Sequence, residues 1–244
     1  MRKASLSAFL ARNPFPNGWT DGLFYREKMR AIHRIAPAVI GGEGAHARVL
    51  EIGGGRSGLA RLLYPEAEVV TLDLDFALRD GGSAVFVCGD ARRLPFADGA
   101  FDAVTLFDVL EHIQDDGIAA REALRVTRSN GVVLVSTPNA DWHYPFYRFM
   151  KPVCPPETEL MANWGHVRRG YSAAKLTELF GASPDRSATF INPVTSFYHD
   201  LAFSRLSRRM RKPLYAVAAP VVSIGYLAHR PGTPGSETAF AWRR

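Results

Sequence analysis

The fold is decided by the stretch Ala47-Arg-Val-Leu-Glu51-Ile-Gly53-Gly-Gly55-Arg-Ser-Gly58. An apolar, β-branched run leads into a glycine-rich turn, and a helical pattern through Leu59 and Leu63 follows it. Glycines carry no side chain, so the backbone of this turn can approach a ligand closely where the helix begins. The stretch therefore predicts a strand, a ligand-binding turn and a helix, unless the turn needs its glycines for geometry alone.

Further β-branched runs alternate with helical stretches downstream of this turn. Strands are predicted over 68–73, 84–88, 101–107 and 132–136, with a helix over 118–126. Strands that alternate with helices form parallel sheets with right-handed crossover connections. The sequence therefore predicts an α/β fold, a Rossmann-like three-layer α/β/α sandwich around a mostly parallel sheet.

The flanking segments predict additions to this core. Residues 19–35 have the apolar spacing of an amphipathic helix, so we expect 1–45 to form a helical lid over the ligand edge of the sheet. Aromatic residues and prolines dominate 140–170, which we expect to be an insertion that shapes a pocket. Within 171–244, Ser172 is the expected N-cap of a helix, and 188–192 and 238–242 are expected edge strands. We expect one domain over 1–244.

Composition and cysteine usage narrow the class of protein. The chain has 244 residues, 47% of them hydrophobic, and a formal net charge of +6 at pH 7. This modest excess does not demand a nucleic acid partner, and we expect none. Cys88, in a predicted buried strand, and Cys154 form neither a metal-ligand cluster nor a disulfide framework. We therefore expect no metal site and a cytoplasmic protein; the N-terminus also lacks the apolar run of a secretory signal.

A basic stretch precedes an apolar one near the C-terminus. Arg205, Arg208, Arg209, Arg211 and Lys212 lead into residues 214–228, which Pro220 interrupts and which are too short to span a membrane. The segment 205–228 could contact an anionic membrane peripherally, bind RNA phosphates, or form a solvated helix. All three interpretations stay open here, as does the oligomeric state.

Three acidic residues lie at the ends of three successive predicted strands. In a doubly wound sheet these ends converge on one crevice, so Glu51, Asp73 and Asp90 are expected around one ligand. Asp73 lies 20 residues beyond Gly53, a spacing at which a carboxylate can reach both hydroxyls of a ribose and would repel a 2′-phosphate. Asp90 and the N–H of Ala91 suit an adenine, although a turn aspartate is the alternative.

Five ordered segments together resemble class I S-adenosylmethionine (SAM)-dependent methyltransferases, in particular the type 11 small-molecule branch. They are Val-Leu-Glu51-Ile-Gly53-Gly-Gly55, Val-Val-Thr-Leu-Asp73, Gly89-Asp90-Ala91-Arg-Arg-Leu94-Pro95-Phe96, Phe101-Asp102-Ala-Val-Thr-Leu-Phe-Asp108-Val-Leu-Glu111-His112, and Arg128-Ser-Asn130-Gly131-Val-Val-Leu-Val-Ser136-Thr-Pro-Asn139. The resemblance covers about 90 residues, 49–139. One departure is Arg56-Ser57, where the family often has Thr-Gly.

The resemblance implies a function, a cofactor and a set of site residues. It implies methyl transfer from SAM to a small-molecule or lipid-linked acceptor, with a hydroxyl oxygen as the expected acceptor atom, and an antiparallel last strand. Segment 46–139 becomes the SAM-binding core and 140–170 the acceptor-pocket insertion. The implied cofactor-binding residues are Glu51, Gly53, Gly55, Gly58, Asp73, Leu74, Asp90, Ala91, Phe107, Asp108, His112 and Tyr25.

Three histidines are candidates for a general base, because imidazole titrates near neutral pH. His112 occupies the family position, His143 lies among the insertion's aromatics, and His166 precedes a helix; a purely structural role is the alternative for each. The aromatic residues Trp142, Tyr144, Phe146 and Tyr147 are expected either to wall the acceptor pocket or to fill a core.

Other functions remain to be weighed. Tyr147-Arg-Phe-Met-Lys151, with Ser136 upstream, resembles the catalytic set of NAD-dependent short-chain reductases, but the surrounding prolines oppose the long helix which that set needs. Asp73-Leu-Asp75 resembles the metal motif of nucleotide-sugar glycosyltransferases, although the glycine turn favours a ribose-binding acid. An RNA methyltransferase and a non-catalytic, membrane-associated binding module are the remaining alternatives.

Overall fold

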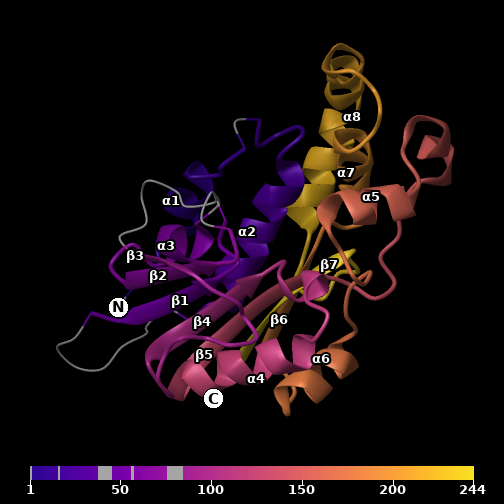
Figure 1. The fold of residues 1–244 in the computed structure, drawn as a ribbon. Coiled ribbons are helices and arrows are strands. Elements are labelled where there is room, and N and C mark those ends of the chain that lie inside the picture. Colours follow the sequence, from indigo (N-terminus) through magenta and orange to yellow (C-terminus); the bar gives the residue numbers. More distant parts are fainter. Residues whose placement is uncertain (1, 16, 38–45, 56–57, 76–84) are drawn as a thin grey trace.

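The computed structural model describes residues 2–15, 17–37, 46–55, 58–75 and 85–244. Within them one seven-stranded sheet has the order β3-β2-β1-β4-β5-β7-β6 (Figure 1). Its strands are β1 (Arg48–Ile52), β2 (Glu68–Asp73), β3 (Val85–Cys88), β4 (Phe101–Phe107), β5 (Thr127–Pro138), β6 (Arg186–Phe190) and β7 (Glu237–Arg243). Neighbours from β3 to β5 pair in parallel, and β7 is antiparallel to both β5 and β6. The predicted Rossmann-like fold and antiparallel last strand are confirmed.

Helices cover both faces of the sheet. The helices are α1 (Leu6–Ala11), α2 (Leu23–Ile35), α3 (Leu59–Leu63), α4 (Asp116–Val126), α5 (Glu157–Trp164), α6 (Ala173–Phe180), α7 (Ser196–Ala202) and α8 (Arg208–Ala228), with short 3-10 turns η2 (Leu110–His112) and η3 (Arg148–Val153). Figure 1 shows α1, α2 and α3 on one face and α4 and α6 on the other. The element α8 stands at the edge beside α7.

Alternating strand residues divide the core into two layers. Val49 packs with α1, α2 and α3, while its neighbour Leu50 packs with α4 and α6. Phe107 and Leu106 repeat this division on β4. Because consecutive strand residues point to opposite faces, near-continuous apolar runs suit strands that are covered on both sides. Each such fully buried side chain contributes about 1.5–3 kcal/mol to folding.

A third apolar cluster joins the insertion to the C-terminal helices. Trp142 and Tyr144 pack with residues of α7 and α8, among them Tyr198, Tyr215 and Tyr226. The Tyr198 hydroxyl donates to the Tyr215 carbonyl at 2.5 Å. The aromatic residues Trp142 and Tyr144 therefore fill a core, the second of the two roles expected for them.

Several sequence-based boundaries were wrong. The amphipathic helix begins at Leu23 rather than at 19, because 17–22 form turns closed by bonds to the Asn17 carbonyl. The fifth strand covers 127–138 rather than 132–136, and the pieces expected at 188–192 and 238–242 are β6 and β7. The short helix α1 was not predicted. Three expectations fall outside the described residues. They are the part of the lid at 38–45, the Arg56-Ser57 departure from the family's glycine turn, and the first residue of the strand expected at 84–88.

Two single-residue expectations also fail. Cys88 is exposed rather than buried, because β3 is an edge strand that pairs only with β2. Pro220 does not interrupt the C-terminal segment, since α8 runs continuously through it. The side chain of Pro220 is exposed, so its ring meets no packed neighbour and the helix tolerates the lost hydrogen bond. No helix among the described residues has the length and apolar content to cross a membrane.

Gly170 fixes the end of the insertion against β5. The Tyr171 N–H donates to the Pro138 carbonyl at 2.9 Å, and a Cβ added at Gly170 would lie 2.1 Å from that same oxygen. No side chain fits at this distance. The close approach brings the insertion back to the carboxyl end of β5, beside the ends of the other parallel strands.

We predict that Gly170→Ala lowers the free energy of unfolding by about 2–4 kcal/mol, because backbone must move to admit the methyl group. Gly232→Ala is the matched control, since an added Cβ there has no neighbour within 4 Å; we expect a change within about 0.5 kcal/mol. Urea unfolding of both variants measures the difference. Equal stability of the two would contradict the packing described here.

Candidate active site

Two adjoining cavities open at the carboxyl edge of the parallel strands. The first has a volume of about 530 Å³, and its walls include Gly53, Asp73, Leu74, Asp90 and Ala91. The second has a volume of about 290 Å³. It is lined by α2, η2 and the insertion, and by residues of α7 and β7. Asp108 and His112 line both cavities, so the two meet at the end of β4.

The glycine turn shapes the floor of the first cavity. Gly53 has φ +64°, and a Cβ there would lie 2.6 Å from the Val109 side chain, so only glycine fits. Glu51 is 2% exposed, and its Oε1 accepts a hydrogen bond from the Ala60 N–H at 2.8 Å. This carboxylate therefore holds the first turn of α3 from beneath instead of facing the cavity.

Asp73 stands at the carboxyl end of β2, half-buried. Its Oδ2 accepts from the Gly55 N–H at 3.2 Å, which ties the glycine turn to the second strand. Its Oδ1 accepts a long bond of 3.4 Å from the Asp75 N–H. A carboxylate offers about four acceptor sites, so both oxygens retain capacity for hydroxyl donors from a ligand.

Asp90 carries both of the features weighed for it in the sequence. Its Oδ1 accepts from the Arg92 N–H at 2.8 Å, the bond of an aspartate turn, and its Oδ2 pairs with the Arg92 guanidinium at 2.7 Å. The hydrogen bonds from Arg92 lower the pKa of Asp90. The carboxylate is thus held ionised in the wall of the first cavity, next to the buried Ala91.

Asp108 organises the junction between the two cavities. Its backbone has φ +53°, a conformation that non-glycine residues rarely adopt. Ser136 Oγ donates to Oδ1 at 2.6 Å, and the Lys28 ammonium donates to Oδ2. Lys28 is only 6% exposed; burial alone would lower its pKa, but the charge and hydrogen bond of Asp108, together with the charges of Tyr25 and Glu237, outweigh burial and raise it. Helix α2 is thereby fixed to the end of β4.

The second cavity is acidic and contains neutral histidines. Burial, reinforced by the Asp108 charge, raises the pKa of Glu237 to about 8 and that of Glu111 well above its usual range. Burial lowers the pKa of His199 to about 4, and burial together with His112 lowers that of His166 to about 4. Both rings are neutral at pH 7. Phe24, Tyr25, Trp164 and Phe203 supply aromatic walls.

One main-chain hydrogen bond and the Arg168 side chain hold η2 against the insertion. The Val167 N–H donates to the Glu111 carbonyl at 2.9 Å. Arg168 Nη1 donates to the carbonyls of Leu110 and Ile113 at 3.1 and 2.8 Å and pairs with Asp116 at 2.6 Å. These contacts satisfy carbonyls of the 3-10 turn and fix His166 beside it.

The structure brings together most of the residues expected from the sequence. Gly53, Asp73, Leu74, Asp90, Ala91, Asp108 and His112 line the first cavity, and Tyr25, His112 and His166 line the second. Glu51, Gly55, Phe107 and Gly58 are not among the lining residues of either. His143 is exposed, stacks on Phe146 and lies in neither wall.

Sequence reasoning missed Lys28, Glu111, His199 and Glu237. Glu111 lies in the family segment 101–112, next to His112, but nothing in the sequence indicates that its side chain is buried. Lys28 offered one weak signal, since a lysine next to Glu27 stands among the apolar residues of the predicted helix; both charged side chains are buried. His199 and Glu237 come from distant segments that only the fold brings to the cavity.

Comparison with known proteins assigns the family. A family model described as a methyltransferase domain matches residues 22–183. The chain belongs to this family of class I methyltransferase domains. The resemblance noted in the sequence is confirmed, and the reductase alternative is wrong: Tyr147 precedes a 3-10 turn, and its hydroxyl donates to the Pro193 carbonyl.

Individual relatives agree in class and differ in acceptor. A demethylmenaquinone methyltransferase of Mycolicibacterium vanbaalenii is 34% identical over 122 residues, 47% of this chain and 50% of that protein. A malonyl-[acyl-carrier protein] O-methyltransferase of Legionella pneumophila is 32% identical over 108 residues, 40% of this chain and 38% of that one. The chain thus matches half or less of the length of these relatives.

A solved structure shows the same fold over nearly the whole chain. It is a SAM-dependent methyltransferase of Thermotoga maritima, described as a possible histamine N-methyltransferase. The TM-score is 0.58 at 16% identity, with 98% of this chain and 99% of that one covered.

We predict that Lys28→Met lowers the free energy of unfolding by about 1–3 kcal/mol, because Asp108 would keep a partly buried charge without its partner. The expected loss of unfolding free energy is smaller than for a fully buried pair, because the Asp108 side chain is 32% exposed. Lys175→Met removes the exposed Lys175–Glu178 pair and should change stability by less than about 0.5 kcal/mol. Equal losses in both variants would contradict a structural role for Lys28.

Proposed function

We propose that the enzyme transfers a methyl group from SAM in the first cavity to a hydroxyl oxygen of a small-molecule or lipid-linked acceptor in the second. The observation that carries this proposal is that the two cavities share Asp108 and His112. A donor in one and an acceptor in the other would meet at that junction. Such alignment is the main catalytic requirement for in-line displacement.

The residues of the first cavity fit SAM. Asp73 would accept both ribose hydroxyls, since each of its oxygens keeps acceptor capacity. Asp90 and the N–H of Ala91 would contact the adenine, and the bare backbone at Gly53 would lie against the methionine portion. Asp90 and Asp108 are paired with Arg92 and Lys28, so Asp73 is the lining carboxylate whose negative charge would favour a sulfonium cation.

Bound SAM supplies an electrophilic methyl group, so the chain's own residues need only to orient the acceptor, exclude water and accept a proton. His112 is the proposed base, because it is exposed at the junction and its Nδ1 faces the Gly165 carbonyl at 3.2 Å. Donation from Nδ1 leaves Nε2 with a lone pair. His166, neutral at pH 7, is the second candidate, and the exposed position of His143 gives it no acceptor to serve.

Helix α2 is proposed to act as the lid. It contributes Phe24, Tyr25 and Lys28 to the second cavity. The bond from Lys28 to Asp108 would couple the position of the helix to the junction between the two cavities. An aromatic wall with apolar and acidic portions suits an acceptor with a ring or chain and a hydroxyl. The named relatives, a demethylmenaquinone methyltransferase and an O-methyltransferase acting on a carrier-linked acyl group, support this range.

We also propose that α8 places the enzyme against an anionic lipid surface. Six apolar side chains form one exposed stripe along it, at helical spacing: Met210, Leu214, Val217, Val221, Ile224 and Leu227. Val217 is 82% exposed. The opposite side packs inward through Tyr215, Val222 and Tyr226. A stripe of this length, about 26 Å at 1.5 Å per residue, matches an interfacial helix.

Charge selects the lipid as the partner of this stripe. Arg208, Arg209 and Lys212 lie at the amino end of α8 and have no ion-pair partner among the described residues, whereas Arg205 and Arg211 pair with Glu159 and Asp21. Unpaired cations at the amino end of a helix that carries an exposed apolar stripe favour phospholipid headgroups of negative charge. A cytoplasmic enzyme held at the membrane in this way would bind a lipid-linked acceptor at the membrane surface.

The SAM proposal predicts that Asp73→Ala weakens SAM binding by at least about 10- to 150-fold, because one charge-assisted hydrogen bond contributes about 1.5–3 kcal/mol. Asp75→Ala is the matched control: its side chain is exposed outside the cavity wall, so affinity should stay within about twofold. Calorimetry with SAM and S-adenosylhomocysteine measures both. Unchanged affinity in Asp73→Ala would overturn the assignment.

The lipid proposal predicts that the protein floats with vesicles containing 30% anionic lipid and that Val217→Glu/Ile224→Glu abolishes flotation. Ala182→Glu/Ser183→Glu adds the same charge at exposed positions remote from α8 and should float like the wild type. Flotation that the stripe variant retains would refute the proposal. The proposal would also be refuted if the wild-type protein stayed in solution as a dimer. In that case the stripe would be the contact surface with a second copy of the chain.

A further inference from the structure

Glu111 presents a carboxylate that the methyl-transfer geometry does not use. It lies in η2 and is 0% exposed, yet neither of its side-chain oxygens accepts a hydrogen bond from another described residue. Burying such a group without a partner costs several kcal/mol, whether it is ionised or protonated. An unsatisfied, fully buried polar group inside a functional cavity points to a ligand that satisfies it.

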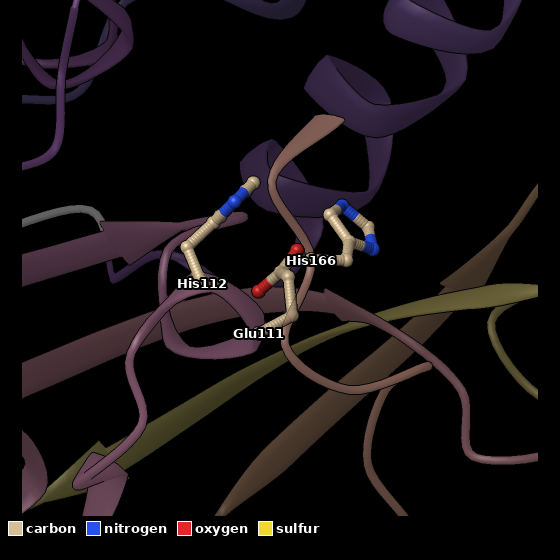
Figure 2. A group of neighbouring side chains, drawn as sticks. All are labelled: Glu111, His112 and His166. Atoms are coloured by element: carbon tan, nitrogen blue, oxygen red, sulfur yellow. The ribbon is translucent and has the colours of Figure 1, made fainter. Parts of the chain in front are cut away.

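Two imidazoles flank this carboxylate. Glu111, His112 and His166 each offer one ligand atom, and these three atoms lie within 4.8 Å of one another. Figure 2 shows the Glu111 oxygens between the two rings, with His112 from the same turn and His166 from the insertion. The ring centroids are 4.7 Å apart. Ligand atoms around one divalent ion lie closer together than 4.8 Å, so binding would draw these side chains inward.

The hydrogen-bonding of the histidines matches that of metal ligands. His112 Nδ1 lies 3.2 Å from the Gly165 carbonyl, so donation there leaves Nε2 as the free lone pair. Metal-ligating histidines usually donate their second N–H to a carbonyl in this way. His166 Nδ1 is buried and has no partner among the described residues, so this ring also keeps an unused nitrogen.

Carboxyl groups outnumber cationic side chains among the residues that line the second cavity. Among its lining residues Asp108, Glu111 and Glu237 are acidic, and Lys28 is the single lysine or arginine. Lys28 is already paired with Asp108. A divalent cation bound beside Glu111 would favour the ionised form of its carboxyl group, the form that acts as a ligand.

The supporting backbone is rigid. The Val167 N–H bond to the Glu111 carbonyl and the two Arg168 bonds to Leu110 and Ile113 hold the turn and the insertion in one register. Ligands from two segments are therefore set against each other before any ion binds, which favours affinity and geometry.

We propose that Glu111, His112 and His166 bind one divalent transition-metal cation in the second cavity. Two nitrogens and one oxygen on one side of the ion form a facial set, which suits Mn²⁺, Fe²⁺ or Zn²⁺ and leaves positions open toward the cavity. No metal site was expected from the sequence, because neither the two cysteines nor Asp73-Leu-Asp75 indicated a cluster of metal ligands. Only the fold brings His166 next to Glu111.

Resting on the proposed function, the ion would hold the acceptor hydroxyl at the junction. Coordination lowers the pKa of a bound hydroxyl, so its proton leaves to solvent water and the oxygen keeps the electron pair. That oxygen then forms the bond to the methyl carbon while the carbon–sulfur bond breaks, and the sulfur takes that bond's electron pair as a neutral thioether. His112 would then act as a ligand instead of a base.

Metal binding to the chelator-treated protein tests the proposal without an activity assay. Titrations with Mn²⁺, followed by electron paramagnetic resonance, and with Zn²⁺, followed by calorimetry, should each show one ion per chain. His166→Ala and Glu111→Gln should weaken binding by at least about tenfold, because each removes a direct ligand. His143→Ala, at an exposed histidine outside the cavity, should bind like the wild type.

SAM affinity separates this proposal from the proposed function. Glu111 and His166 do not line the first cavity, so both variants should keep wild-type SAM affinity, which also shows that they are folded. A wild type that binds SAM but neither Mn²⁺ nor Zn²⁺ overturns the metal site alone. Ion binding that His166→Ala and Glu111→Gln both retain also overturns it. If Glu111→Gln fails to fold, His166→Ala decides.

Discussion

The structure depends on the way Asp108 is held at the end of β4. That strand lies between β1 and β5, and its last residues leave the sheet where the two cavities meet. Lys28 from α2 and Ser136 from β5 both donate to the Asp108 carboxylate. One side chain thus links the N-terminal helix, the central strand and the next parallel strand, and its uncommon backbone conformation is maintained by these contacts.

The two cavities that meet at this junction are built from different kinds of segments. The first cavity is built by local strand–turn–helix units, in which Gly53, Asp73 and Asp90 each stand at a strand end. The second cavity is built by segments far apart in the sequence, α2, the insertion, α7 and β7, with Arg168 and Gly170 fixing the insertion. The first half suits a cofactor that the whole family shares, and the second half suits an acceptor that differs between members.

This division explains how much the sequence predicted. The mostly parallel core and the strand-end positions of Asp73 and Asp90 followed from periodicity and from the family's motifs, because local spacing determines them. The order of the strands within the sheet was not predicted. Glu51 was expected in the cofactor site, but its side chain lies beneath α3, because it points to the same face of β1 as Val49, the face that α3 covers. Trp142 and Tyr144 were possible pocket walls and instead fill a core with α7 and α8. Lys28, Glu111 and Glu237 were missed, because their burial and mutual contacts exist only after the chain has folded.

The central claim is that the cofactor and the acceptor meet at Asp108 and His112. A crystal structure of the protein with S-adenosylhomocysteine tests it most directly. We expect density for the ribose at Asp73, the adenine beside Asp90 and Ala91, and the sulfur directed toward the junction with the second cavity. A nucleoside bound elsewhere, or a sulfur that faces away from Asp108 and His112, would contradict it.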